Sequence, residues 1–581
     1  EVEKVCNAGG FLVAHNAVAE LGWLAKHGLD LREVVVYDTM LGEWVLQAGM
    51  PAHQGQLSLE GTAARRSVGV KSEWTTILFN GVRASEIPYT ALLERCTNDV
   101  LLTAKSFKLQ LQELKSKSSC SYGSYDSSYV KLKDQKLEAK ELSTIKNTIE
   151  SSSIESFIEQ EACQQGSIAA KQLHHSLVAV QFCRSMMTPM LCDMQREPLL
   201  LDKALVDFEY QKATARREEI LRTMYILTGG ININSRPQLA TYVYGTLGFT
   251  CTEKTPSGAP SVKEEVLEAL VAKTKEQREF KELMSEYIAL NTMISKNLEL
   301  FYGLCDEQES KMWVEIRQGT TATHRLSSIG VPFKHSLWKQ PKKAQGQNIP
   351  RTLKHLFRAP EGYKIGEVDG SALEFRVAAS MSGDQVALQE IVDLYDIHSG
   401  TAAVYKCSRQ DAKPRTFKPL YGGTGGSPAD KKYSKFFREK YHVINDMQES
   451  WVTEAMLTKQ VRSPLGLVYN FPDITTDGRG YCNRKRDIYN YPVQGAATAE
   501  IIPIAMLLMW YNQPQGVRMV LQVHDSIVSY VKPEAEQEWL RMSTWALTSG
   551  CRDFLKRVYK YDLGTVELGI GAKLGTHWGT G

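Results

Sequence analysis

Two aspartates, Asp369 and Asp525, stand at the ends of apolar, strand-like segments. Asp369 follows the run 363–368, and Asp525 lies at the tip of a predicted hairpin, 518–531. If these strands are neighbours in one sheet, both carboxylates emerge at the same edge and can share divalent cations. Mg²⁺ prefers oxygen ligands, and two such ions clamp the attacking and leaving oxygens of an in-line phosphoryl displacement. Taken singly, either aspartate is better explained as a turn or helix cap.

A second set of side chains recurs every four residues, which places them in one stripe if the segment is helical. The members are Arg409, Lys413, Phe417 and Tyr421. Two cations followed by two rings suit a triphosphate and a stacked base, because guanidinium and ammonium groups both bind phosphate oxygens. Pro419 is expected to kink the helix. An amphipathic surface helix explains the stripe equally well.

The elements that position these groups belong to several domains. At 581 residues the chain is too long for one hydrophobic core, and we expect three or four domains. Its 43% hydrophobic and 23% charged residues are typical of a folded soluble protein and exclude a disordered, collagen-like or heptad-repeat chain. The longest apolar run, 501–510, is far shorter than the roughly 20 residues of a membrane span. It predicts a buried helix, and no membrane is expected among the partners.

Charge and cysteine content give weaker indications. The net charge of +3, from 69 basic and 66 acidic residues, does not by itself indicate a nucleic-acid binder. The segment 324–360, however, is rich in lysine and arginine and holds no acidic residue, which suits phosphate binding. A solvated basic loop is the alternative. The 11 cysteines have no CxxC spacing, which predicts free thiols in a reducing compartment, and we expect a cytoplasmic location.

Read in order, the motifs resemble those of family A DNA polymerases, particularly the bacteriophage type, which implies a phage-infected bacterial host. The matching segments are 232–235, 323–328 with 347–350, 369–376, 396–398, 409–422, 490–495 and 522–525. The resemblance implies an α/β multidomain fold. Its core is a right-hand polymerase with palm, fingers and thumb, preceded by a truncated RNase H-like 3′–5′ exonuclease domain.

The resemblance also implies roles for single residues. Asp369 and Asp525, with the Gly370 carbonyl, hold two Mg²⁺ ions, for which Mn²⁺ can substitute. Lys413 is a candidate catalytic proton donor to pyrophosphate. The implied nucleotide-binding residues are Arg409, Lys413, Phe417, Tyr421, His398, Glu374 and Gly370. Those implied to contact primer and template are Arg325, Asn348, Arg486, Asn490, Gln494 and His524.

The choice of substrate depends on Glu374. In the resembled DNA polymerases this glutamate excludes a ribose 2′-hydroxyl by steric clash, and Phe417 is likewise the DNA-family residue. The residues 369–371 and 524–526 instead resemble those of single-subunit RNA polymerases. Most DNA polymerases of the resembled family carry Glu at the position of Ser526. We therefore expect a DNA-directed DNA polymerase that acts on primer-template DNA and dNTPs. The alternatives are an RNA polymerase-like enzyme and a catalytically inert DNA-binding protein.

The expected domain order follows the motifs. It is an exonuclease-like domain (1–112), a polar linker or insert (113–172), palm entry and helical thumb (173–320), palm (321–390), fingers (391–480) and palm (481–581). We expect a monomer, with any replication factors unidentified.

The exonuclease-like domain is expected to be degenerate. Asn16 and Glu20 match the second exonuclease motif, with Glu20 where Asp is usual, and Asp99 matches the third. Arg95 replaces the tyrosine of that motif. The first motif would precede Glu1, and we expect that an upstream part of the chain is missing. Because a two-metal nuclease needs these ligands, proofreading is predicted to be absent or impaired. Ordinary surface acids are the alternative explanation for Glu20 and Asp99.

Overall fold

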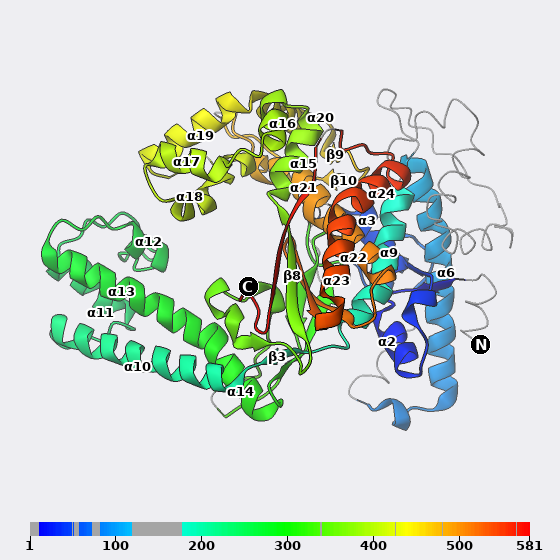
Figure 1. Ribbon diagram of the computed structural model, residues 1–581, viewed down its shortest axis with the longest axis horizontal. Coiled ribbons are helices and arrows are strands. Elements are labelled where there is room, and N and C mark those ends of the chain that lie inside the picture. Colours follow the sequence, from blue (N-terminus) through cyan, green and yellow to red (C-terminus); the bar gives the residue numbers. More distant parts are fainter. Residues whose placement is uncertain are drawn as a thin grey trace.

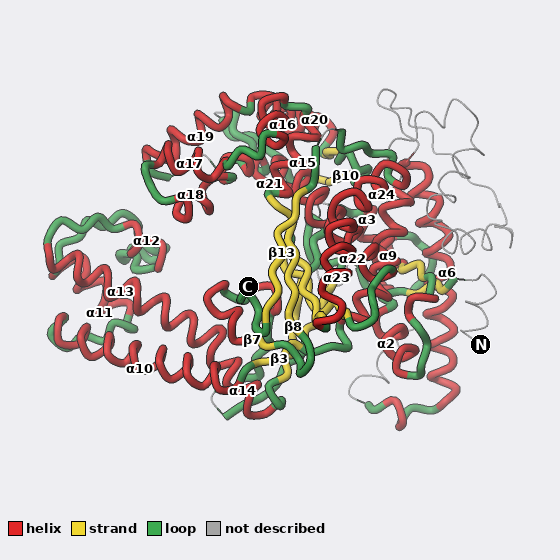
Figure 2. Tube along the Cα trace, viewed as in Figure 1, coloured by secondary structure: helices red, strands yellow, loops and turns green. Residues whose placement is uncertain are grey.

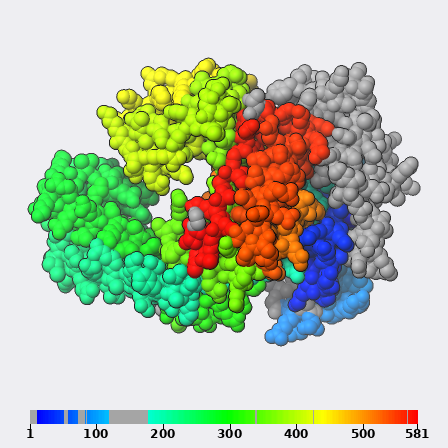
Figure 3. Space-filling model, in the orientation of Figure 1, coloured from blue at the N-terminus to red at the C-terminus, as the bar shows by residue number. Residues whose placement is uncertain are grey.

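The protein was analysed as a computed structural model, which describes residues 11–48, 50, 57–71, 82–118, 177–336, 338, 340–423, 426–478, 480–564 and 566–580. Figure 1 shows a central sheet with a long helical arm on one side and a helical cap above it. We use "the arm" for residues 203–307 and "the cap" for residues 385–458. In the space-filling view, the molecule is hollowed between the arm and the cap (Figure 3).

The central sheet is antiparallel and has the strand order β11-β12-β8-β13 (Figure 2). The strands are β11 (Val517–Val523), β12 (Ser526–Val531), β8 (Lys364–Ser371) and β13 (Gly569–Gly575). The predicted hairpin is confirmed, but its tip is only His524–Asp525, because Ser526 already pairs in the ladder with Asp369. The prediction that Asp369 follows its strand is wrong: β8 continues to Ser371, and Asp369 lies within the ladder.

Helices cover one face of this sheet (Figure 1). They are α9 (Leu177–Met194), the π-helical stretch η8 (Gly495–Ile501), α22 (Ile502–Tyr511), α23 (Glu536–Trp545) and α24 (Cys551–Val558). Among them α9, η8 and α22 are almost wholly buried. A helix that is apolar all round must be enclosed by protein, and most residues of α22 are buried, as predicted for 501–510. Among the described residues, the helical run 485–511 is long and apolar enough to cross a membrane, but 89% of its apolar window is buried within the protein.

The arm consists of antiparallel helices with an apolar core of their own. Its helices are α10 (Lys203–Leu227), α11 (Arg236–Ala240), α12 (Glu264–Ala269), α13 (Lys275–Met293) and α14 (Glu299–Glu307), with π-helical stretches η3 (Thr241–Thr246) and η4 (Ile294–Leu298). Thr274 caps α13 in a reciprocal capping box with Gln277, which fixes where that helix begins. The predicted helical character of this region is confirmed.

The cap is also helical and is joined to the sheet through α15 (Leu373–Ser382) and α21 (Lys485–Gln494). Its helices are α16 (Gln385–Val392), α17 (Ile397–Tyr405), α18 (Arg409–Thr416), η7 (Lys418–Tyr421), α19 (Pro428–Lys440) and α20 (His442–Thr458). The single helical stripe predicted over 409–421 is corrected here. Helix α18 ends at Thr416, and Phe417 links it to the short 3₁₀ turn η7, because Pro419 cannot continue an α-helix.

The described N-terminal part is α/β, as the sequence predicts. Strands β1 (Leu12–Ala14) and β2 (Val36–Asp38) pair in parallel through α2 (Val18–Lys26). Helices α3 (Thr39–Leu46), α4 (Leu59–Arg65) and α6 (Tyr89–Ser118) complete it. Short strands β3 (Leu199–Leu201), β4 (Lys311–Met312), β5 (Val314–Arg317), β6 (Ser327–Gly330), β7 (Phe357–Arg358), β9 (Gln460–Arg462) and β10 (Val468–Asn470) lie elsewhere in the chain. The predicted polar linker, 113–172, is described only to residue 118, where it continues α6.

A buried ion pair ties α9 to the core helices. Arg184 of α9 donates to both carboxylate oxygens of Glu500, and the Tyr559 hydroxyl donates to the same carboxylate at 2.6 Å. Both charged side chains are almost fully buried. Burial raises the pKa of Glu500, while Arg184 opposes that rise. Each charge therefore depends on the other for its stability inside the protein.

We predict that Glu500→Ala lowers the free energy of unfolding by about 3–5 kcal/mol, because it leaves the Arg184 guanidinium buried and uncompensated. Chemical denaturation of parent and variant measures the change. The double variant Arg184→Met with Glu500→Leu should recover most of the loss, since it removes both charges. Glu534→Ala, at an exposed position, is the control. A Glu500→Ala protein as stable as the control would show that the pair does not anchor α9.

Candidate active site

A cleft of about 720 Å³ lies where the sheet meets the cap, and it is lined by side chains from both. It brings together residues that are far apart in the sequence. The predicted residues that line it are Arg325, Asp369, Gly370, Glu374, His398, Arg409, Lys413, Phe417, Tyr421, His524 and Asp525. The sheet supplies the carboxylates, and the cap supplies the cations and rings.

Asp369 lies on β8, and Asp525 lies at the tip of the hairpin whose second strand, β12, pairs with β8. The Gly370 N–H donates to the Asp525 carbonyl at 3.1 Å, which fixes the hairpin tip against β8. Burial, followed by repulsion from Asp525 and Glu367, raises the pKa of Asp369 above its usual value. Burial likewise raises the pKa of Asp525. Two neighbouring carboxylates that are partly buried favour a bound cation, because the cation offsets both their repulsion and their lost hydration.

Arg325 lines the same cleft and is held by residues of the neighbouring helices. Its guanidinium donates to Glu374, at the start of α15, and its Nε donates to the Thr498 hydroxyl at 2.5 Å. Gln494, with its amide oriented to suit its neighbours, accepts from the same guanidinium at 2.8 Å. Burial raises the pKa of Glu374, and the Arg325 charge opposes that rise. Arg325 is therefore fixed in direction before any ligand binds.

The cations of the cap are organised by Asp396. Its carboxylate accepts from the backbone N–H groups of His398 and Ser399 at the start of α17. It also accepts two bonds from the Arg409 guanidinium, at 2.7 and 3.2 Å. One carboxylate thus holds the N-terminus of α17 and the first cation of α18 together. The Arg409 side chain is half exposed and faces the cleft.

Rings stack beside these cations. Phe417 lies nearly parallel to Phe375 of α15, with ring centroids 5.5 Å apart, and meets the His398 ring edge-on at 5.6 Å. Burial, followed by the positive charge of Arg409, lowers the pKa of His398, so this ring is neutral near pH 7. The His398 Nδ1 lies 2.9 Å from the Thr416 hydroxyl, which donates its own hydrogen to the Ala412 carbonyl, so Nδ1 carries the ring proton and Nε2 is an acceptor.

Four predicted residues lie outside the cleft lining. Asn348 is exposed on a short 3₁₀ turn and donates to Gln345 at 2.5 Å. Arg486, Asn490 and Gln494 all lie on α21, and among them Gln494 reaches the cleft through Arg325. Arg486 lies beside Gly422, one residue after Tyr421.

Sequence reasoning missed three contributors. Asp396 was noted only as part of a motif, although an aspartate just before a helical pattern signals an N-cap. Thr498 and Glu367 carried no signal, because their roles depend on packing between distant segments. Glu367 lies two residues before Asp369 on β8 and is ion-paired with Lys354 at 2.7 Å.

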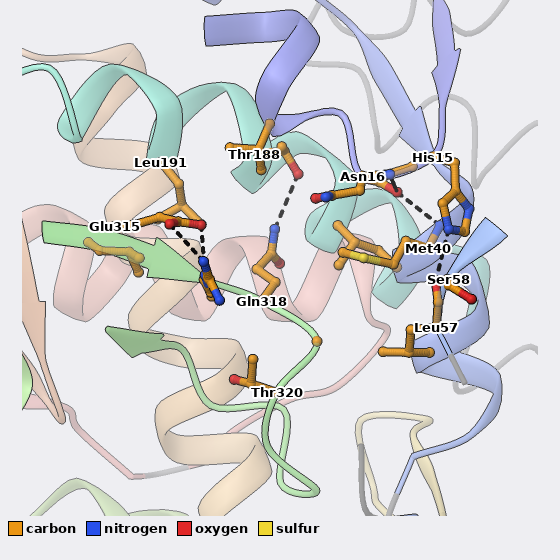
Figure 4. Close-up of a pocket in the computed structure, with 16 residues that line it drawn as sticks. His15, Asn16, Met40, Leu57, Ser58, Thr188, Leu191, Glu315, Gln318 and Thr320 are labelled. Atoms are coloured by element: carbon orange, nitrogen blue, oxygen red, sulfur yellow. Dashed lines mark hydrogen bonds and ion pairs between the residues drawn. The ribbon is translucent and has the colours of Figure 1, made fainter. Parts of the chain in front are cut away.

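The predicted exonuclease residues Asn16, Glu20 and Asp99 all lie in the described N-terminal part. Asn16 lines a second cleft, of about 690 Å³, between the N-terminal part and the β5–β6 hairpin (Figure 4). Glu20 is exposed on α2, and Asp99 on α6 is ion-paired with Lys71 at 3.4 Å; neither lines that cleft. Within the described ranges, no three His, Cys, Asp or Glu side chains cluster as a metal site.

Comparison with solved structures identifies the fold. The POL domain of Pol1 from M. smegmatis, in a complex with DNA primer-template and dNTP, aligns with a TM-score of 0.66. The alignment covers 97% of this chain and 86% of that one at 18% identity, so it supports a shared fold. The chain therefore has the fold of a polymerase domain.

Sequence comparison identifies the family. The family model for DNA polymerase family A matches residues 205–580, well over half of the chain, and the chain belongs to this family. The thermostable DNA polymerase I of Thermus filiformis is 28% identical over 392 residues, 63% of this chain and 44% of the relative. DNA polymerase I of Pseudomonas aeruginosa is 26% identical over 410 residues, 65% and 42% respectively. The matched part of the chain spans less than half the length of these relatives.

We predict that Asp525→Asn lowers the pKa of Asp369, because repulsion from Asp525 is one of the causes that raise it. The pKa should stay above the ordinary value, since burial is the larger cause and is retained. An infrared pH titration, taken as the difference between a protein and its Asp369→Asn derivative, isolates this carboxyl group. Asp553→Asn, at an exposed position, should change nothing. An unchanged value in Asp525→Asn would mean that the two carboxylates do not interact.

Proposed function

We propose that the protein is a template-directed DNA polymerase that adds dNTPs to a primer 3′-hydroxyl by phosphoryl transfer. The observation that carries the proposal is the cleft, in which paired carboxylates of the sheet face the cations and rings of the cap. Membership of DNA polymerase family A supports the same reaction. Primer-template DNA and dNTPs are the partners we propose, and we propose a monomer in the cytoplasm, in a phage-infected host.

Two Mg²⁺ ions are the proposed cofactors, with Mn²⁺ as a substitute. The donor set fits them, because Asp369, Asp525 and the Gly370 carbonyl offer hard oxygen ligands that line one cleft. When bound, such ions activate the primer hydroxyl and neutralise the triphosphate. Ser526, in place of the usual glutamate, leaves Glu367 as the nearby additional carboxylate on this sheet face.

The protein's own groups then bind and orient the nucleotide. Arg409 and Lys413 supply positive charge along one side of the cleft, and His398 lies beside them as a further proposed nucleotide-binding residue. Lys413 is the proposed proton donor to the departing pyrophosphate, because its ammonium faces the same cleft. Phe417 and Tyr421 offer ring faces to the new base pair.

Primer and template are proposed to lie along the floor of the cleft. Arg325 and His524 line it, while Asn490, Gln494 and Arg486 follow along α21 and Asn348 lies beyond it. Contacts of this kind position a duplex without reading its sequence. The arm is the proposed thumb and the cap is the proposed fingers, with the boundaries given by the motifs.

The N-terminal part is proposed to be a degenerate exonuclease-like domain with proofreading absent or impaired. Glu20 in place of the usual aspartate, and Arg95 in place of the usual tyrosine, support this proposal.

We predict that Asp525→Asn abolishes primer extension in Mg²⁺ while primer-template binding persists, because the change removes a ligand charge but keeps the side-chain shape. Gel-based extension and fluorescence anisotropy measure the two properties. Asp553→Asn should extend primers at the parent rate. A parent protein that binds DNA but adds no nucleotide would favour the inert DNA-binding protein instead.

We predict that Glu374→Ala increases rNTP incorporation relative to dNTP, because it opens space beneath the sugar. Glu374→Gln keeps the bulk and should keep most of the discrimination, although its bond to Arg325 is weaker. Single-nucleotide incorporation with matched dNTP and rNTP measures the ratio, and Glu361→Ala, at an exposed position, is the control. Equal use of both nucleotides by the parent would favour the RNA polymerase alternative.

A further inference from the structure

Arg325 is carried by a tight turn between strands β5 and β6. Within this turn the His324 N–H donates to the Thr321 carbonyl at 3.2 Å, and the Thr321 hydroxyl donates to the Arg325 carbonyl at 2.8 Å. His324 adopts the left-handed conformation, with φ +63°, which is unfavourable for a residue with a side chain. Such a conformation persists only where surrounding contacts hold it.

The contact that holds the turn comes from the N-terminal part. The indole of Trp44, on α3, stacks on the His324 ring with centroids 3.8 Å apart and planes 8° from parallel. The indole Nε1 also donates to the Thr321 carbonyl at 3.3 Å. Trp44 therefore contacts both the side chain and the backbone of the turn, and both rings are almost fully buried.

The stack acts on orientation as well as on packing. Neither ring nitrogen of His324 has a hydrogen-bond partner of normal geometry among the described residues, and the polar group that acts on the ring most directly is the Trp44 backbone. Burial, followed by the charge of Arg184, holds the pKa of His324 well below its usual range, so the ring is neutral. Because the plane of the His324 ring is fixed by the stack on Trp44, the position of Trp44 constrains the backbone of His324 and of the following residue, Arg325.

The platform beneath Trp44 is itself rigid. Asp38 caps α3 by accepting from the Met40 N–H at 2.9 Å, and its other oxygen accepts from the Ala17 N–H. Glu43, next to Trp44, forms a buried ion pair with Arg66 at 2.7 Å. The indole is therefore set by contacts within the N-terminal part.

We propose that Trp44 is a positioning residue for Arg325, so that the N-terminal part sets the primer-binding arginine of the polymerase cleft. The inference deepens the proposed function, because it assumes that Arg325 contacts primer-template DNA. It gives the exonuclease-like part a task that needs no nuclease chemistry.

A double-mutant cycle tests the proposal. Primer-template affinity is measured by fluorescence anisotropy without nucleotide, for Trp44→Ala and Arg325→Ala singly and together. Loss of the stack and of one hydrogen bond should weaken binding about tenfold in the parent background. In the Arg325→Ala background the same change should weaken binding less than about twofold, because the group it positions is gone. Trp44→Phe, which keeps a stacking ring, should bind within about threefold of the parent.

Two further variants separate positioning from stability. His324→Gly removes the other ring and suits the left-handed backbone, so it tests the stack without truncating the N-terminal core, and it should weaken binding as Trp44→Ala does. Phe107→Ala truncates that core at Tyr37 and Phe11, away from the turn, and should bind DNA like the parent.

Equal weakening by Trp44→Ala in both backgrounds, or equal weakening by Phe107→Ala, would overturn the proposal in favour of general stabilisation. Because binding is read without nucleotide, a parent that binds DNA but fails to extend it contradicts the proposed polymerase activity and leaves this cycle to decide the role of Trp44.

Discussion

The candidate site depends on one register, the antiparallel pairing of β8 with β12 that sets Ser526 opposite Asp369. This pairing brings the hairpin tip, with Asp525, against the C-terminal end of β8. A slip of one residue would turn Asp369 to the other face of the sheet and separate the two carboxylates. On the other side of β8, Gly571 faces Asp369, and a Cβ there would come within 2.6 Å of its carboxylate oxygen. The sheet therefore spaces the charges and leaves room around them.

Of the four acidic side chains around the hairpin tip, two are ion-paired within the described part of the chain and two are not. Lys354 neutralises Glu367, and Arg325 neutralises Glu374, but no ion pair of the described residues neutralises Asp369 or Asp525. The two cations of the cap also differ in this respect. Arg409 is ion-paired with Asp396, whereas Lys413 has no ion pair in the described structure. The groups left with uncompensated charge are thus the ones that face each other across the cleft.

Much of this arrangement could be predicted from sequence, because short motifs carried the signal. The hairpin around Asp525, the buried helix at 501–510 and the cleft-lining cations all follow from local pattern. What could not be predicted depends on contacts between distant segments. Thr498 meets Arg325 across 173 positions, and Trp44 meets Thr321 across 277, and no local pattern marks either pairing. The helix break at Phe417 also depends on packing. The prolines predicted a kink, but they did not predict that the rings of Phe417 and Tyr421 would both line the cleft.

The separate core of the arm has a mechanical consequence. Along α10, Val206 and Ala213 pack into the main core, whereas Ile220 and Met224 pack into the arm's own core. The chain returns along α13, where Tyr287 still packs into the arm's own core. Ile294, the first residue of the π-helical stretch η4, packs into the main core. The arm is therefore joined to the main body at two neighbouring places, between Ala213 and Ile220 on α10 and at η4. If the arm turned at these two points, the hollow between the arm and the cap would change in width while both cores stayed buried, so that binding of a long ligand and stability of the main body could be adjusted separately.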